Sequence, residues 1–248
     1  MNVAETLVVV PQAKELAPLL GAFVAAGYEP RKVTLGRLEC HLFEELRLLF
    51  AVGGHGKAQL AVRTQHLIEQ GAHFQVVICA GAAGRLGSEL GLGDAVVGMS
   101  TIEHDYKLRF VCGPLPSYQA DAHLVAEFRF AASQIGEEIR VVFGAIASGD
   151  EDIIDPARAR ELREATGALC VAWEGAGAAR AASFSGLQFL EVRAITDGAD
   201  HTAAADFQAN LERSMPKLAQ LLLKWALVRR QGRPTHGSRG RSSPTAEP

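Results

Sequence analysis

The stretch that most constrains the fold of this chain runs from residue 169 to residue 201, LCVAWEGAGAARAASFSGLQFLEVRAITDGADH. An apolar run ends at Glu174, a segment of small residues with helical character follows, and a second apolar run over residues 189–195 leads to Asp197. This order predicts a strand, a helix and a strand, with a carboxylate where each strand ends. Open α/β sheets bind ligands in the crevice at the carboxyl ends of their strands. We therefore expect Glu174 and Asp197 to reach one edge of a sheet and to form part of a site.

Strands and helices alternate along the rest of the chain as well. Strands are expected over residues 7–10, 33–38, 39–43, 46–52, 74–80, 94–102, 107–111 and 140–147, of which 33–38 and 39–43 form an edge hairpin. Helices are expected over residues 13–26, 59–70, 121–135, 155–166 and 206–228. Such alternation is typical of a three-layer α/β/α domain. A chain of 248 residues can bury the core of one such domain, which we place over residues 1–228.

The last twenty residues, 229–248, differ from the rest in composition. They contain five arginines, three prolines and a single acid, with no aliphatic residue beyond one alanine, so we expect a disordered basic tail. The tail carries a charge of +4, so the rest of the chain holds about −7 of the formal net charge of −3. A negative body disfavours nucleic acid as its partner, because phosphate contacts need clustered Lys and Arg.

Several other classes are also disfavoured. No apolar run of the length of a membrane span is free of charge, and the N-terminus lacks a basic segment before its apolar run, so we expect a cytoplasmic protein without a membrane anchor. The four cysteines, Cys40, Cys79, Cys112 and Cys170, are widely spaced and form no CxxC pair. This spacing indicates core thiols rather than a disulfide framework or a zinc site.

Two glycine-rich segments follow expected strands without matching a nucleotide motif. Residues 53–57, GGHGK, lack the spacing of a P-loop, and residues 81–87, GAAGRLG, lack the GxGxxG order of a dinucleotide fingerprint and no helix of useful length follows them. We therefore expect no nucleotide cofactor. Both segments still permit a ligand to approach the backbone closely, although a tight turn alone would also account for residues 53–57.

Three groups of residues, taken together, resemble the purine nucleoside phosphorylase superfamily and within it the methylthioadenosine/S-adenosylhomocysteine nucleosidases. They are residues 76–84 with 92–97, the triplet Ser148-Gly149-Asp150, and Trp173-Glu174 with residues 193–197. The resemblance runs in consistent order from about Leu7 to Leu223. It implies a single α/β domain with a central mixed sheet, usually a homodimer. It also implies hydrolysis of the N-glycosidic bond of an adenine nucleoside, without a metal or cofactor.

The resemblance assigns roles to three acids. Glu15, just after the first strand, takes the place of the glutamate that activates water. Glu174 matches the residue that binds the ribose hydroxyls, and Asp197 matches the acid that protonates the purine. Each acid also has a purely structural interpretation, as a partner of a helix dipole for Glu15, a core or capping group for Glu174 and an Asx turn for Asp197.

The expected substrate-binding residues include both matches and departures. Gly81 and Ala82 lie in the glycine turn, Ile153 lies where the base is expected, and Phe207 falls where the family has an aromatic wall near the 5′ substituent. Trp173 replaces the family's methionine beneath the sugar. Three further departures are Ala82 in place of a serine or threonine, Glu151-Asp152 in place of an aromatic residue beside the base, and Ala172 in place of an acid.

The chemistry of glycosidic cleavage accounts for this set of residues. A purine leaves readily once its N7 is protonated, so a carboxylic acid must remain protonated beside it, which would require an environment that raises the pKa of Asp197. The absence of a hydroxyl at Ala82 favours water over phosphate as the nucleophile. We expect a nucleosidase that acts on a 5′-modified adenine nucleoside. The alternatives are a phosphate-dependent purine nucleoside phosphorylase and a non-catalytic nucleoside-binding protein of the same fold.

Overall fold

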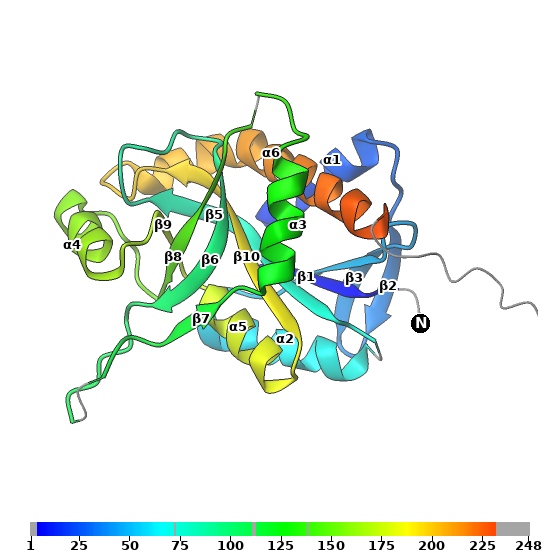
Figure 1. Cartoon of the computed structure of the whole chain (residues 1–248), viewed down its shortest axis with the longest axis horizontal. Coiled ribbons are helices and arrows are strands. Elements are labelled where there is room, and N and C mark those ends of the chain that lie inside the picture. Colours follow the sequence, from blue (N-terminus) through cyan, green and yellow to red (C-terminus); the bar gives the residue numbers. More distant parts are fainter. Residues whose placement is uncertain (1–3, 72, 111–112, 138, 232–248) are drawn as a thin grey trace, which may run out of the picture.

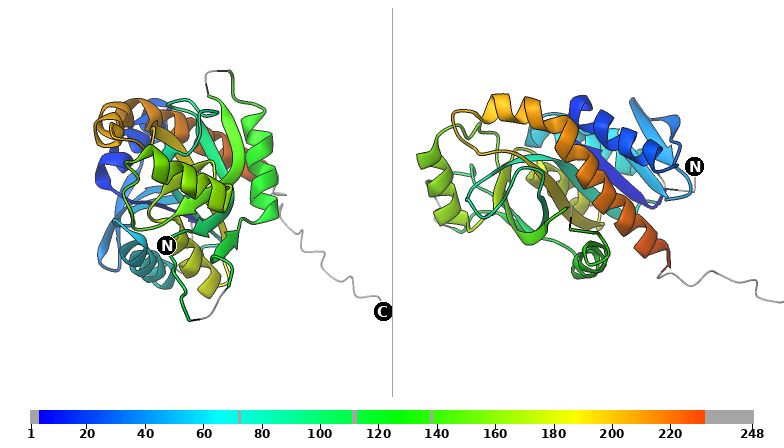
Figure 2. Two further views of the ribbon diagram at one scale, coloured as in Figure 1. Left: turned by 90° about the vertical axis from the view of Figure 1, so that its left-hand side faces the viewer. Right: turned by 90° about the horizontal axis from the view of Figure 1, so that it is seen from above.

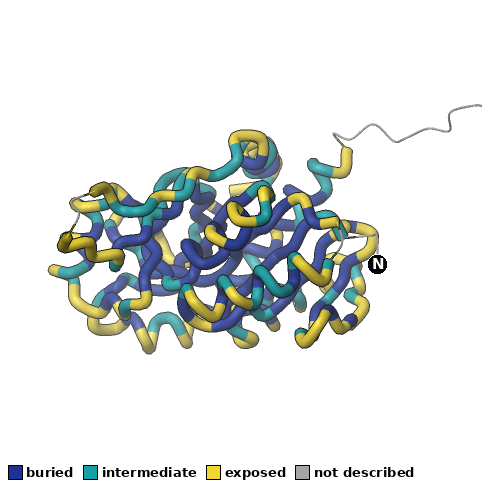
Figure 3. Tube along the Cα trace, turned by 90° about the horizontal axis from the view of Figure 1, so that it is seen from below, coloured by how far each residue is buried: buried dark blue, intermediate teal, exposed yellow. Residues whose placement is uncertain are grey.

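The computed structural model describes residues 4–71, 73–110, 113–137 and 139–231 (Figure 1). Within these residues the chain forms a 10-stranded mixed sheet. Its strands are β1 (Thr6–Val10), β2 (Arg31–Leu35), β3 (Leu38–Phe43), β4 (Leu48–Val52), β5 (Val76–Arg85), β6 (Ala95–Glu103), β7 (Ser117–Gln119), β8 (Val141–Ser148), β9 (Cys170–Ala172) and β10 (Gln188–Asp197). The central strands β1, β5 and β10 are buried along almost their whole length. Figure 3 shows the buried segments in the interior of the molecule and the exposed ones around its outside.

Helices cover both faces of this sheet. They are α1 (Ala13–Ala25), α2 (Lys57–Gln70), α3 (Ala122–Ala132), α4 (Pro156–Thr166), α5 (Gly175–Phe184) and α6 (Ala203–Gln231). Helices α1, α3 and α6 pack together on one face, α2 packs against α5 on the other, and α4 lies beside β8 at one end (Figure 1, Figure 2). The predicted three-layer α/β/α fold is therefore confirmed, as is the mixed central sheet that the resemblance implied.

One half of the sheet closes on itself. The strand order is β10-β6-β8-β9-β5-β1-β4-β3-β2, and β10 also pairs with β5, so that β5, β10, β6, β8 and β9 form a closed ring. The other half, β1, β4, β3 and β2, continues from β5 as an open sheet. Strand β5 belongs to both halves, because it pairs in parallel with β1 and β10 and antiparallel with β9.

The closed ring explains why a segment that we expected to be a glycine loop is a strand. Residues 81–85 continue β5, and their backbone pairs with β10 along residues 81–84 and with β9 at Gly84 and Arg85. Glycine and alanine are weak strand formers by themselves. Here they are held in the sheet by pairing with β10, and at Gly84 by β9 on the other side as well, which the local sequence does not reveal.

Two other sequence predictions need correction. Residues 107–110 are not a strand, and Val111 lies outside the described residues; the short strand β7 pairs with β6 instead. Helix α6 starts at Ala203 and extends to Gln231, so the first three residues of the expected disordered tail are helical. Arg229 is fixed there by an ion pair with Glu127, 2.9 Å between Nη1 and Oε2. Residues 232–248 lie outside the described residues.

Two further features of the described residues are the length and polarity of the helices and the state of the cysteines. Among the residues that the structure describes, none of the helices is long and apolar enough to cross a membrane. Cys40, Cys79 and Cys170 are free and buried, as expected of core thiols, and Cys112 lies outside the described residues.

Candidate active site

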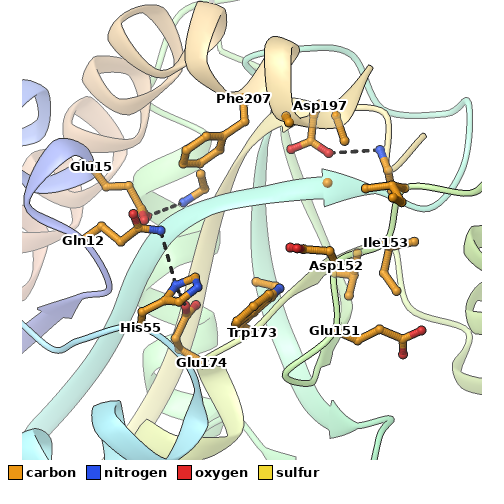
Figure 4. A pocket seen from close by; sticks show the side chains of 18 of the residues that line it. Gln12, Glu15, His55, Glu151, Asp152, Ile153, Trp173, Glu174, Asp197 and Phe207 are labelled. Carbon is orange, nitrogen blue, oxygen red and sulfur yellow. Dashed lines mark hydrogen bonds and ion pairs between the residues drawn. The ribbon is translucent and has the colours of Figure 1, made fainter. Parts of the chain in front are cut away.

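A cavity of about 450 Å³ opens where β5, β9 and β10 meet the first turns of α1 and α6 (Figure 4). Almost all of the residues that the sequence singled out line it: Glu15, Ala82, Ile153, Trp173, Glu174, Asp197 and Phe207. Gly81 lies just behind, against Glu15 and Arg193. The structure thus brings the predicted residues together, and their roles stay predictions.

The two acids reach this cavity by a different route from the one we expected. Strand β9 runs antiparallel to β5 while β10 runs parallel to it, so Glu174 and Asp197 do not follow parallel strands. Gly84 pairs with Val171 on one side and with Asp197 on the other. After Val171 the chain runs back along β5 toward the start of that strand. Glu174 Oε2 then lies 3.5 Å from Nη2 of Arg193, the β10 residue that pairs with Gly81.

Positions along β5 therefore give the distance between Asp197 and the other two acids, Glu15 and Glu174. Asp197 lies level with Gly84, whereas Glu15 binds Ala82 and Glu174 lies near the level of Gly81. A strand rises about 3.3 Å per residue, so these levels are roughly 7–10 Å apart along β5. That is the scale of a nucleoside, with its base at one end and its sugar at the other. Figure 4 shows Asp197 and Ile153 at one end and Glu15 and Glu174 at the other.

Asp197 owes its orientation to an irregularity in β10. The pairing with β5 shifts register between Ile195 and Asp197, and such a bulge re-aims the side chain that follows it. The carboxylate accepts hydrogen bonds from Thr196 Oγ1 at 2.9 Å and from the Ala199 amide at 3.0 Å. The second of these is the expected Asx turn. Burial raises the pKa of Asp197 although both hydrogen bonds oppose it, so the acid keeps its proton to a higher pH than a free aspartate.

Glu15 is held at the other end of the same strand. Its carboxylate is buried in the first turn of α1, and Oε2 accepts a hydrogen bond from the Ala82 amide at 3.0 Å. Burial, and then the nearby charge of Glu174, raise the pKa of Glu15 to about 7. A Cβ on Gly81 would lie 2.5 Å from Glu15 Oε2, so glycine is what permits this approach. A carboxylate with a pKa near neutrality is suited to general-base catalysis.

Glu174 belongs to a buried charge network, centred on Arg193, that the sequence did not reveal. Arg193 Nη2 lies 3.5 Å from Glu174 Oε2, and Arg193 Nε donates to Glu191 Oε1 at 2.8 Å. Glu191 in turn accepts from Thr101 Oγ1. Burial raises the pKa of Glu174, and the charge of Arg193 opposes that rise. The signal that could have identified this network is the pair of opposite charges, Glu191 and Arg193, inside an otherwise apolar run of β10.

His55 is a second residue whose position the sequence did not predict. It follows β4 in the glycine segment, and its ring stacks on Trp173 with centroids 4.2 Å apart. Nδ1 lies 3.5 Å from Glu174 Oε1 and 3.5 Å from Gln12 Nε2. Trp173 is therefore one face of a stacked aromatic pair rather than a lone substitute for methionine (Figure 4).

Asp152 and Lys14 also line the cavity and carry charge. Asp152 lies beside Ile153 at the Asp197 end, where the resemblance led us to expect an aromatic residue (Figure 4). Lys14 places Nζ 4.5 Å from the ring centroid of Phe207.

As for metals, the described part of the chain contains no group of three or more His, Cys, Asp or Glu side chains that could hold an ion.

The geometry agrees with comparisons to known proteins. Residues 6–226 match the phosphorylase superfamily. The chain belongs to this family.

Individual relatives are similar over most of their length. A 5′-methylthioadenosine/S-adenosylhomocysteine nucleosidase of Geobacillus kaustophilus is 30% identical over 220 residues, which cover 85% of this chain and 88% of the relative. Among solved structures, the nucleosidase of that name from Helicobacter pylori is 25% identical with a TM-score of 0.81, covering 91% of this chain and 98% of its own. A futalosine hydrolase of Helicobacter pylori has a TM-score of 0.79 at 25% identity, covering 90% and 97%.

Proposed function

We propose that this protein is a nucleosidase that hydrolyses the N-glycosidic bond of a 5′-modified adenine nucleoside of the methylthioadenosine/S-adenosylhomocysteine type. The products are free adenine and a ribose derivative. The observation that carries the proposal is the distribution of three buried acids along one cavity, with Asp197 at one end and Glu15 and Glu174 at the other. The relatives named for this activity support the same choice of substrate.

Asp197 acts as the general acid in this proposal. Burial raises its pKa and so favours the protonated carboxyl, which transfers its proton to N7 of the purine as the bond between C1′ and N9 breaks. The base then leaves as a neutral molecule instead of an anion. General acid catalysis of this kind is worth roughly 10²–10⁴-fold in rate.

Glu15 acts as the general base on the other side of the sugar. It accepts a proton from a water molecule whose oxygen bonds to C1′ of the oxocarbenium-like sugar. The division of labour between an acid and a base on opposite faces resembles that of inverting glycosidases. The hydrogen bond from the Ala82 amide leaves one carboxylate oxygen of Glu15 free for the water.

Glu174 binds the ribose hydroxyls. Hydrogen bonds to an ionised carboxylate strengthen as positive charge grows on the sugar ring, so they stabilise the transition state more than the ground state. Arg193 favours the ionised form of Glu174 from behind, and the Gly56 amide, 3.4 Å from Oε1, supports it from the side. We propose that Trp173 and Phe207 form the walls beside the sugar and its 5′ group.

A base-release assay with and without inorganic phosphate tests the function. Release of adenine from 5′-methylthioadenosine in phosphate-free buffer, together with the free thiosugar, supports hydrolysis. Strict dependence on phosphate would instead establish a phosphorylase, for which Ala82 lacks a hydroxyl. Tight binding without release at any phosphate concentration would establish a non-catalytic nucleoside-binding protein.

We further propose that the protein is a cytoplasmic homodimer. Support for the dimer comes from the connection between β6 and β7, where the large side chains of Tyr106, Leu108 and Phe110 are exposed. Clustered exposed apolar groups mark interaction surfaces. Light scattering of the eluted protein should give twice the chain mass, and Phe110→Ser should shift it toward the monomer. A monomer at micromolar concentration for the unaltered protein would contradict the proposal.

A further inference from the structure

Arg193 carries its charge into the interior of the protein, behind Glu174. Its side chain is fully buried. Nη1 donates to the Ala82 carbonyl at 3.3 Å and Nη2 donates to Cys79 Sγ at 3.4 Å, so the guanidinium group lies against β5. A Cβ on Gly81 would lie 2.7 Å from Nη1, so the glycine leaves room for it. A buried guanidinium needs a negative partner nearby, because taking its charge out of water is costly.

Two carboxylates face this guanidinium at different distances. Nε of Arg193 donates to Glu191 Oε1 at 2.8 Å, whereas Nη2 lies 3.5 Å from Glu174 Oε2. The first distance is that of a charge-assisted hydrogen bond, and the second is too long for one. Glu191 is therefore the main counter-charge of Arg193. Glu174, which lines the cavity, keeps its carboxylate available to a ligand.

Glu191 is fixed by contacts away from the cavity. It is buried, and it is not among the described residues that line the cavity. Its Oε2 accepts a hydrogen bond from Thr101 Oγ1. A Cβ on Gly175 would lie 2.1 Å from the same oxygen, so the carboxylate occupies the space that this glycine leaves open. Gly175 directly follows Glu174, so Glu191 packs beneath the turn that carries the cavity-lining acid.

We propose that Glu191 is a positioning residue that holds the Arg193 guanidinium by its Nε and balances its charge, so that Glu174 stays free to bind the sugar. The inference rests on the proposed function, which assigns the sugar hydroxyls to Glu174. Without the charge of Glu191, Arg193 would pair with Glu174 directly. That pairing would close the 3.5 Å gap and occupy a carboxylate oxygen that the sugar hydroxyls need.

The titratable groups around this pair come from several elements. They are Glu15 and Lys14 on α1, His55 after β4, Cys79 on β5, Cys170 on β9 and Glu174 before α5. Burial raises the pKa of both thiols, which are therefore neutral. Arg193 lowers the pKa of Glu15 and of Glu174 against the effect of burial. If Glu191 loses its charge, more of the Arg193 charge acts on both acids.

A titration of Glu15 by NMR tests the proposal in the full-length protein without substrate. Glutamate is labelled with ¹³C at the side-chain carboxyl carbon, and the Glu15 resonance is identified by its loss in Glu15→Gln. We expect a midpoint at about pH 7 in the unaltered protein and about one pH unit lower in Glu191→Gln. The glutamine can accept from Arg193 Nε and donate to Thr101 Oγ1, so the variant removes the charge and keeps both contacts. An unchanged midpoint overturns the inference.

Arg193→Gln shows whether Glu191 acts through Arg193. In this background Glu191→Gln should shift the Glu15 midpoint by less than roughly 0.3 pH unit. An equal shift in both backgrounds would mean that Glu191 acts on Glu15 directly, which overturns the inference. If Glu191→Gln alone does not fold, recovery of folding in the double variant supports the inference, because the charge of Arg193 was then the cause. Failure of both variants to fold overturns it.

Kinetics at pH 8, where Glu15 is ionised in both proteins, test the effect on Glu174. Glu191→Gln should lower kcat/KM for 5′-methylthioadenosine by at least about tenfold, because Arg193 then engages the sugar-binding carboxylate. An unchanged kcat/KM overturns the inference and leaves the proposed function standing. If the unaltered protein cleaves no nucleoside, the function fails, and the NMR titration decides whether Glu191 balances Arg193.

Glu39→Gln is the matched control. Glu39 is an exposed glutamate on β3 outside the cavity, and the chemical change is the same. This variant should keep both the Glu15 midpoint and kcat/KM of the unaltered protein. A shift as large as that of Glu191→Gln would show that any lost carboxylate has this effect, and it would overturn the inference.

Discussion

At the scale of single residues, burial gives three chemically similar carboxylates different properties. Burial is the largest cause of the raised pKa of Glu15, Glu174 and Asp197 alike. Their partners then distinguish them. The positive charge of Arg193 favours the ionised form of Glu174. Asp197 has only neutral hydrogen-bond donors, Thr196 and Ala199, and the nearby negative charges of Asp206 and Asp200 favour its protonated form. This difference suits Glu174 to ionised binding of hydroxyls and Asp197 to proton donation.

Replacing Asp197 with asparagine should lower kcat by at least about 10²-fold, equivalent to about 2.7 kcal/mol. The amide occupies nearly the same volume, and its oxygen can still accept from the Ala199 amide while its NH2 group takes the position that faces the Thr196 hydroxyl. It cannot donate an acidic proton to the base. Single-turnover release of adenine measures the loss, and a thermal melt verifies the fold. Near-native turnover in this variant would remove Asp197 from the role of general acid.

The pH dependence of kcat/KM should reveal Glu15. Because its pKa is raised to about 7, the fraction of ionised base rises as the pH increases through 7. We expect kcat/KM to fall about tenfold per pH unit below that value. Glu15→Gln should lose hydrolysis while nucleoside binding is kept. Weaker binding with an unchanged kcat would assign Glu15 to the substrate-binding residues instead.

At the scale of elements, the small residues of β5 let side chains from three other elements reach one strand. Gly81 makes room for Glu15 of α1 and Arg193 of β10, and Gly84 makes room for Asp197. A strand of large residues would pair in the same register but would push these groups away. The composition of β5 is therefore part of the site.

Gly84→Ala tests this reasoning. A Cβ at that position would lie 2.5 Å from Asp197 Oδ1, so the carboxyl must move away from its hydrogen bonds. We expect kcat to fall by at least tenfold with a smaller change in KM, because the displaced group is the proposed proton donor. Gly21→Ala on α1 is the control, since a Cβ there meets nothing within 4 Å. It should keep activity and stabilise the helix by roughly 1 kcal/mol. Equal activity in both variants would show that Asp197 tolerates the displacement.

At the scale of the whole molecule, closing half of the sheet into a ring buries a group of charges beneath the cavity. Glu15, Glu174, Glu191 and Arg193 are all buried at the junction of the ring with the open sheet. Of these, Glu15 and Glu174 have carboxylates whose pKa is raised by burial, so folding favours the protonated form of both. Their presence should make the stability of the protein depend on pH.

Folding raises the pKa of Glu15 from 4.5 to about 7, so the folded state holds a proton that the unfolded state releases between these values. The free energy of unfolding should therefore decrease as the pH rises from 4.5 to 7 and remain lowered above 7. Glu15→Gln removes the contribution of this carboxyl group to the pH dependence, and the glutamine oxygen can still accept a hydrogen bond from the Ala82 amide. Its melting temperature relative to wild type should be higher at pH 8 than at pH 5. The same difference at both pH values would mean that Glu15 is ionised throughout.

The sequence alone determined most of the elements and the identity of the three acids. Residues 121 and 155–156 marked the starts of helices, and the structure has Asp121 and Asp155 as N-caps, because capping is decided by neighbours in the chain. The same holds for the apolar strands around Val8 and Val192. The resemblance selected Glu15, Glu174 and Asp197, and all three line one cavity.

Only the tertiary structure decided how these groups meet. The antiparallel pairing of β9 with β5 moves Glu174 toward Gly81, and the bulge in β10 aims Asp197 at Gly84. Arg193, His55 and Lys14 gain their places at the cavity through partners far away in sequence. The propensity of a residue for helix or strand depends on its neighbours within a few positions. The closure of the sheet depends instead on hydrogen bonds between strands that are far apart in the sequence, such as β5 with β9 and with β10. The chain thus encodes its acids locally, and the closed sheet determines which end of the cavity each of them occupies.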